Sequence, residues 1–148
     1  MTKIQTTWDS WANIYTDGSK NPINISAGYR IHIHSSKPQA HSVCLPDGQS
    51  VFTAELEAIH HALKLIQELL EARAVVLSDS LSALQAISGR NSNSRPNTVN
   101  NILFEYTKLS DQGQQVELCW IPSHLGIHGD ETVDSLAKLD TKTKRRYS

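Results

Sequence analysis

Hydrophobic and polar positions follow two different periods along the chain, and the change of period separates predicted strands from predicted helices. Apolar and polar residues alternate between about residues 25 and 34, which predicts a half-buried strand, and residues 40–45 form a plausible hairpin partner. Residues 12–16 predict an earlier strand that the turn-forming residues 17–22 should end. The first third of the chain therefore predicts three antiparallel strands.

A helical period replaces the alternation from residue 53 to residue 71, where apolar residues recur at steps of three and four. Residues 73–77 predict a short strand buried on both faces, and Ser80 can cap the helix that follows it. The remaining predicted elements are a helix over 99–109, a strand over 116–120 and a last helix over about 130–139. This order predicts an α/β fold with a five-stranded mixed sheet, three antiparallel strands followed by two parallel ones, and helices on both faces.

Four acidic residues stand where this fold would bring side chains together. Asp17 and Asp79 each follow a predicted strand. Glu55 lies on the buried side of the long helix near its start, and Asp134 projects from the last helix. Close carboxylates repel one another unless protons or metal ions neutralise them, and their hard oxygen atoms suit Mg²⁺ or Mn²⁺ better than zinc. Because the chain holds 15 acidic residues, some reach strand ends by chance, and position alone does not establish a site.

Size and composition limit the classes of protein to consider. A chain of 148 residues is the size of one domain, so we expect a single unit with a core over about residues 12–139 and terminal extensions at 1–11 and 140–148. The apolar runs are too short to span a bilayer and the N-terminus lacks a secretory signal, which indicates an intracellular protein of the cytoplasm or nucleus without membrane contact. Cys44 and Cys119 are expected to be reduced and buried. A net charge of -1 predicts weak autonomous binding to nucleic acid.

Four short motifs carry a resemblance to a known family. They are Ile14-Tyr15-Thr16-Asp17-Gly18-Ser19, Thr53-Ala54-Glu55-Leu56-Glu57-Ala58, Leu77-Ser78-Asp79-Ser80, and the run from Trp120 to Ala137 that contains Ser123-His124-Leu125-Gly126 and Asp134. In this order they resemble the four motifs of type I ribonucleases H. The residues of the last two motifs are most similar to those of ribonuclease H domains in non-LTR retrotransposon polyproteins.

The resemblance implies a ribonuclease H-like fold and an endonuclease that hydrolyses the RNA strand of RNA–DNA hybrids by a two-metal-ion mechanism, leaving 3′-hydroxyl and 5′-phosphate ends. It implies two Mg²⁺ ions, for which Mn²⁺ can substitute. Asp17 would be shared by both ions, with Glu55 and Asp79 on one of them. Asp134 would complete the other ion, and His124 matches a mobile histidine that assists product release or metal exchange. Contacts to the substrate, recognised by its minor-groove shape and 2′-hydroxyls, are expected at Gly18, Ser19, Lys20, Asn21 and Ser80.

The same resemblance implies partners. A retrotransposon domain would be covalently linked to a reverse transcriptase, and this tether would compensate for weak binding of the hybrid. The isolated domain is expected to be a monomer. The chain departs from cellular family members at Val51, Phe52 and Leu81, where those enzymes contact the hybrid with amides, and this difference puts the substrate affinity in doubt.

Several alternatives stay open. Asp130 stands where the family usually has Asn, and it lies four residues before Asp134, so either carboxylate can approach the metals. The motif favours Asp134 and makes Asp130 a helix cap. His124 and His128 could be interpreted as a zinc pair, but no cysteine or third histidine stands at ligand spacing. Transposases and integrases share the sheet and the acids, and a non-catalytic spacer or hybrid-binding domain is the alternative from a different class.

Overall fold

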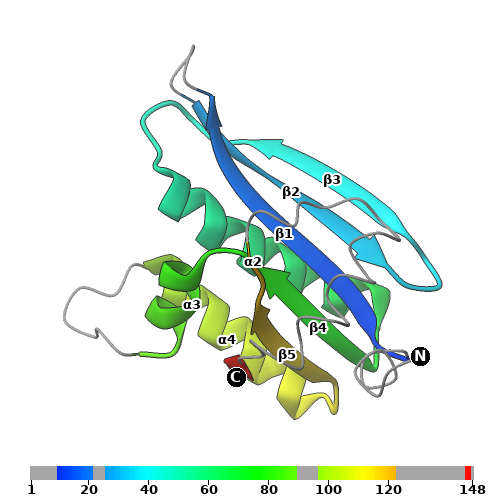
Figure 1. The fold of residues 1–148 in the computed structure, drawn as a ribbon. Helices are drawn as coiled ribbons and strands as arrows, with labels where there is room; N and C mark the ends of the chain where they lie inside the picture. The colour runs from blue at the N-terminus through cyan, green and yellow to red at the C-terminus, as the bar shows by residue number, and fades with distance from the viewer. Residues whose placement is uncertain (1–9, 22–25, 90–96, 123–145, 148) are drawn as a thin grey trace.

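One mixed sheet organises the part of the chain that the structure, a computed structural model, describes: residues 10–21, 26–89, 97–122 and 146–147. Within these ranges six strands pair in the order β3-β2-β1-β4-β5-β6, and three helices pack against the sheet (Figure 1). The strands are β1 (Ala12–Asn21), β2 (Ser26–His34), β3 (Gln39–Cys44), β4 (Arg73–Ser78), β5 (Gln115–Trp120) and β6 (Arg146–Tyr147).

The sheet has an antiparallel half and a parallel half. Strand β1 pairs antiparallel with β2, and β2 pairs antiparallel with β3. Strand β1 also pairs in parallel with β4, and β4 with β5. The predicted five-stranded mixed sheet is therefore confirmed. The short strand β6, antiparallel to β5, was not predicted, because two residues are too few to show a period.

Strand β1 continues past the turn that the sequence predicts at residues 17–22. Its residues from Asp17 to Asn21 pair antiparallel with β2, whereas its parallel pairing with β4 ends at Thr16 opposite Ser78. The prediction of a strand that stops at Thr16 is therefore wrong, because pairing with β2 overrides the local turn preference of these residues. Asp17 is internal to β1, yet it lies just beyond the end of the contact between β1 and β4.

The described helices lie close to the predicted positions. They are α2 (Val51–Leu69), α3 (Leu81–Ile87) and α4 (Asn97–Asp111). The Ser50 side chain accepts a hydrogen bond from the Thr53 N–H at the start of α2, and Ser80 caps α3 as predicted. Leu70 follows α2 in the left-handed conformation, with a φ of 55°. None of these helices combines the length and the apolar character that crossing a bilayer requires.

The three helices cover one face of the sheet. Alternate strand residues such as Ile14 and Ile31 point to this face and join α2, α3 and α4 in one apolar cluster. The opposite face carries a separate apolar cluster formed by Tyr15, Val75, Leu77, Cys119 and Ile121. The helix expected over residues 130–139 lies outside the described residues, so a helix on this second face stays a prediction.

The two cysteines differ in their surroundings. They form no disulfide with each other, and Cys119 is buried in the second apolar cluster. Cys44 is exposed, because it lies on the edge strand β3 and no helix in the described ranges covers its side of that strand. The prediction that Cys44 is buried is therefore wrong.

Candidate metal site

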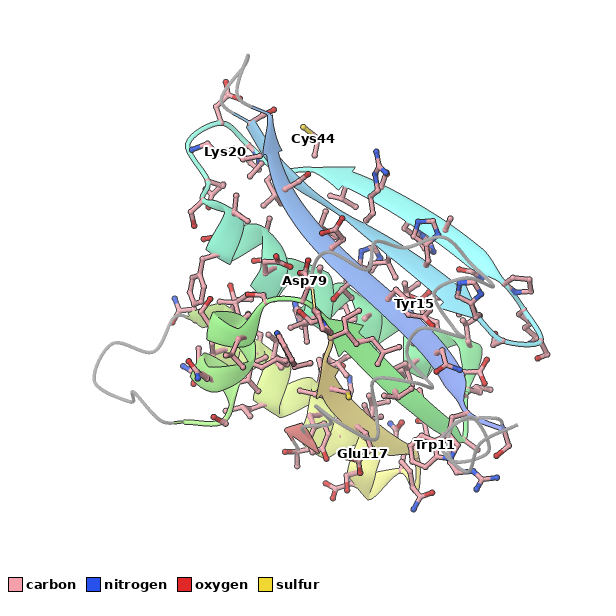
Figure 2. The ribbon with its side chains drawn as sticks, viewed as in Figure 1. Trp11, Tyr15, Lys20, Cys44, Asp79 and Glu117 are labelled. Atoms are coloured by element: carbon pink, nitrogen blue, oxygen red, sulfur yellow. The ribbon has the colours of Figure 1, made fainter. Side chains whose placement is uncertain are left out.

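Three of the four predicted carboxylates meet at one place. Asp17 lies on β1, Glu55 lies on α2, and Asp79 directly follows β4. Each offers a carboxylate oxygen, and these oxygens all lie within 4.8 Å of one another. Figure 2 shows Asp79 where the chain leaves β4. Residues distant in sequence thus form one acidic cluster.

The register of the sheet sets Asp17 beside Asp79. Thr16 and Ser78 are the last parallel pair of β1 and β4, so the next residue on each strand carries a carboxylate. The buried hydroxyl of Thr16 donates a hydrogen bond to the Leu77 carbonyl oxygen at 3.3 Å. This bond ties the two strands together one residue before the acidic cluster.

The turn that carries Asp79 is held by the serines on both sides of it. Ser78 Oγ accepts a hydrogen bond from the Ser80 N–H at 3.1 Å, and Ser80 Oγ accepts one from the Ala83 N–H at 3.2 Å. Ser78 is fully buried, and its carbonyl oxygen accepts a hydrogen bond from the Ile121 N–H at 2.9 Å. Local side-chain hydrogen bonds of this kind fix the backbone of a turn, so Asp79 has little freedom to withdraw from the cluster.

Glu55 reaches the cluster from the side of the helices. It is only 7% exposed, and its Oε1 accepts a hydrogen bond from the Gly18 N–H at 3.0 Å. A Cβ atom at position 18 would lie 2.9 Å from Glu55 Cδ and 3.1 Å from the Glu55 amide nitrogen. Such contacts are closer than van der Waals packing allows, so this approach of α2 to β1 requires glycine.

Replacing Gly18 by Ala is expected to displace Glu55 and weaken divalent-metal binding by on the order of 10- to 100-fold, the loss typical when the support of a ligand is removed. Calorimetric titration with Mn²⁺ measures the affinity. Ser19→Ala, on the exposed neighbouring residue, is the matched control and should bind as the parent does. Equal affinities of Gly18→Ala and the parent would contradict the requirement for glycine.

Burial raises the pKa of all three carboxyl groups, and repulsion from a neighbouring carboxylate raises it further at Glu55 and Asp79. Burial, followed by the charge of Asp79, raises the pKa of Glu55 to about 8. Burial and then the charge of Asp17 raise the pKa of Asp79. Burial also raises the pKa of Asp17, and the positive charges of Arg30 and His32 on β2 partly offset this effect. The cluster without a cation therefore retains a proton near neutral pH.

This donor set fits a divalent cation that prefers oxygen ligands. Asp79 Oδ1 is buried and has no hydrogen-bond partner among the residues that the structure describes. Buried polar atoms are normally satisfied, so this oxygen points to a ligand still to be bound. Three carboxylates with little exposure to water suit Mg²⁺ or Mn²⁺, whose charge would remove the repulsion between them. No other group of three potential ligands occurs in the described ranges.

Comparison with known families agrees with this site. The sequence model of the ribonuclease H family matches residues 9–142, which is most of the chain. The chain belongs to the ribonuclease H family. Ribonucleases H are metal-dependent nucleases that cleave RNA in RNA–DNA hybrids, so this protein is a ribonuclease H whose substrate is an RNA–DNA hybrid.

The structure describes only some of the other residues predicted for this ribonuclease H. Ser19 and Lys20 are exposed on β1, and Figure 2 shows Lys20 toward the end of that strand. Asn21 is the last residue of β1. Ser80 is half-buried, and its hydroxyl serves the cap of α3. Four residues lie outside the described ranges: His124, His128, Asp130 and Asp134.

Two basic residues near the site of this ribonuclease H were missed by the sequence reasoning. Arg30 lies directly opposite Asp17 in the β1–β2 ladder, and His32 is the next residue on the same side of β2. The alternating pattern assigned His32 to the outward side of its strand. The alternating pattern does not show which β1 residue lies opposite a given β2 residue, because the register of the two strands depends on where β1 ends.

Proposed function

We propose that this ribonuclease H cuts the RNA strand of RNA–DNA hybrids by a two-metal-ion mechanism and leaves 3′-hydroxyl and 5′-phosphate ends. The observation that carries the proposal is the cluster of Asp17, Glu55 and Asp79, whose oxygens lie within 4.8 Å of one another. Clustered carboxylates hold the paired cations of many phosphodiester hydrolases. Mg²⁺ is the proposed ion, with Mn²⁺ as a substitute, because both prefer carboxylate oxygens.

The proposed roles divide the carboxylates between two ions. Asp17 would be shared by both, Glu55 and Asp79 would complete one, and outside the described residues Asp134 would complete the other. Bound divalent cations supply Lewis-acid stabilisation of negative charge on the phosphate and a stronger nucleophile from water at neutral pH. Glu55, whose pKa is raised to about 8 without a cation, would release its proton when the site is loaded.

Residues beside the carboxylates would hold the hybrid. Ser19 and Lys20 are exposed on the strand that carries Asp17, and the Lys20 ammonium group suits a backbone phosphate. Gly18, Asn21 and Ser80 are the further proposed contacts. We assign His124 an assisting role in product release or metal exchange.

We also propose that residues 1–148 form one intracellular domain, monomeric when isolated, that works while linked to the reverse transcriptase of a non-LTR retrotransposon. A net charge of -1 gives little attraction to phosphates. Val51 and Leu81 are exposed at the starts of α2 and α3, and their side chains offer no hydrogen bond to a sugar edge. A tether would offset this weak binding by raising the local concentration of the hybrid.

Cleavage of an end-labelled RNA–DNA hybrid tests the proposed function. With Mg²⁺ or Mn²⁺ the protein should cut the RNA strand internally and leave duplex DNA and duplex RNA intact. The downstream fragments should be ligatable through a 5′-phosphate, and the upstream fragments should be extendable from a 3′-hydroxyl. Cutting of duplex DNA would favour the transposase and integrase alternative, whereas metal binding without any cutting would favour the non-catalytic one.

A matched pair of variants tests the fourth ligand. Asp134→Asn is expected to lower kcat by about 10²- to 10³-fold, because it removes a charge that the proposed second ion needs. Asp130→Asn should leave kcat within about threefold of the parent, because Asn caps a helix as well as Asp does. Steady-state cleavage of the hybrid gives both kcat values. The opposite ranking would assign the ligand role to Asp130.

A further inference from the structure

A second group of possible metal ligands lies on the helix-covered face of the sheet, apart from the acidic cluster. His41 lies on the edge strand β3, and His61 lies on α2. Their ring centroids are 5.3 Å apart, with the ring planes tilted by 60°. Both side chains are half-buried. Neither residue belongs to the proposed catalytic machinery, so their contact needs a separate explanation.

One nitrogen of each ring already has a partner. His41 Nε2 lies 2.9 Å from Gln39 Oε1, and because this oxygen only accepts, Nε2 carries the proton. His61 Nδ1 lies 2.9 Å from the Tyr29 hydroxyl oxygen, which can accept a hydrogen bond from the Nδ1–H group. In this tautomer His41 Nδ1 and His61 Nε2 both keep their lone pairs. Metal-binding histidines usually have this arrangement, with one nitrogen held by a neighbour and the other free for the ion.

The separation of the rings matches that of two imidazoles on one tetrahedral ion. An ion about 2.0–2.1 Å from each ligating nitrogen lies about 3.2 Å from each ring centroid, so two rings at a tetrahedral angle have centroids about 5.2 Å apart. The observed distance is 5.3 Å. The distance between the ring centroids is therefore that of two imidazoles bound to one ion.

The surroundings keep His61 neutral, which is the form that binds metal. Burial, followed by the proximity of His41, lowers the pKa of His61. Lys64 and His60 also lower this pKa, whereas Glu68 raises it. Imidazole nitrogen suits Zn²⁺, Ni²⁺ and Cu²⁺, whereas Mg²⁺ prefers oxygen. The histidine pair and the acidic cluster should therefore select different ions.

We propose that His41 and His61 form a binding site for a divalent transition-metal ion of the imidazole-preferring class, Zn²⁺, Ni²⁺ or Cu²⁺, which clamps the edge strand β3 to α2. Tyr29 and Gln39 orient the two rings, and water completes the coordination. The site is independent of the proposed nuclease function, because it shares no residue with the acidic cluster.

Titration with Ni²⁺ alone, by calorimetry in an Asp79→Asn background that disables the acidic cluster, tests the proposal. His41→Gln and His61→Gln should each weaken Ni²⁺ binding at least tenfold, and Tyr29→Phe, which keeps both histidines, should weaken it by about tenfold. His34→Gln is the matched control, since His34 is also half-buried on the sheet but packs on Tyr15 at the opposite face. It should bind Ni²⁺ as the parent does.

Thermal unfolding provides the second readout. In the same Asp79→Asn background, Ni²⁺ should raise the unfolding midpoint of the protein with both histidines and of His34→Gln but not of His41→Gln or His61→Gln, because only a site formed in the folded state transfers binding energy to stability. Unchanged Ni²⁺ affinity in both histidine variants, each shown to unfold cooperatively, would overturn the proposal. Binding abolished by His124→Gln instead would move the site to the other pair, His124 and His128.

Discussion

Asp79→Asn is expected to lower hybrid cleavage by on the order of 10³-fold while raising the thermal unfolding midpoint of the metal-free protein. The loss follows because the variant removes a charged ligand from the acidic cluster. The unfolding midpoint rises because Asp79 repels Glu55 and so raises the pKa of Glu55. An Asn amide at position 79 would instead donate a hydrogen bond to Glu55. Relief of about 1 kcal/mol corresponds to roughly 2–4 °C for a domain of this size.

Single-turnover cleavage and calorimetric unfolding in EDTA measure the two effects on the same preparation. Asp47→Asn is the control, because Asp47 is exposed and outside the cluster, and it should change neither quantity appreciably. A variant that lost cleavage and was also less stable without metal would show that the three carboxylates are not under strain. Opposite signs of the two changes are the expected signature of a site whose ligands repel one another when no cation is bound.

The affinity for Mg²⁺ or Mn²⁺ is expected to rise about tenfold per pH unit between roughly pH 6 and pH 8. Burial, followed by Asp79, raises the pKa of Glu55 to about 8, so below that pH a cation must displace a proton from the cluster. Each unit of pH changes the cost of that displacement by about 1.4 kcal/mol. The slope should flatten above pH 8, where Glu55 is already ionised.

Stability without metal should show the opposite dependence. The pKa of Glu55 is 4.5 ordinarily and about 8 in the fold, so between these values the folded chain holds a proton that the unfolded chain has lost. The stability that protonated Glu55 contributes is therefore fully present below pH 4.5 and is lost as pH rises toward 8.

Mn²⁺ titration in buffers of different ionisation enthalpy counts the proton that metal binding releases, and Glu55→Gln should release none. A pH-independent affinity of the parent would contradict the raised pKa.

Sequence periods were sufficient for two of the elements that carry the acidic cluster, the helix of Glu55 and the strand before Asp79. The helical repeat around Glu55 indicated its buried side, and the apolar strand before Asp79 indicated a strand end. Both signals are local, because a residue's face on a helix and its distance from a strand end depend on nearby residues. The motif order then supplied the family, which the match over residues 9–142 confirmed.

Features that depend on pairing between distant segments could not be predicted in the same way. The residues from Asp17 to Asn21 have turn-forming side chains, yet they extend β1 because β2 lies beside them. The same register sets Arg30 opposite Asp17, and no local pattern encodes that neighbour. The exposure of Cys44 follows from the edge position of β3, which the strand pattern alone does not reveal. Tertiary pairing overrode local preference in each case.

The three carboxylates come from β1, α2 and the end of β4, so the metal site exists only after all three elements have docked. A cation that binds this site therefore acts as a ligand of the complete fold and lowers the fraction of chains that are partly open. Proteases cut the open chains, so a ribonuclease H short of divalent metal should be degraded faster in the cell as well as being inactive. Metal supply would then set the lifetime of the protein together with its activity.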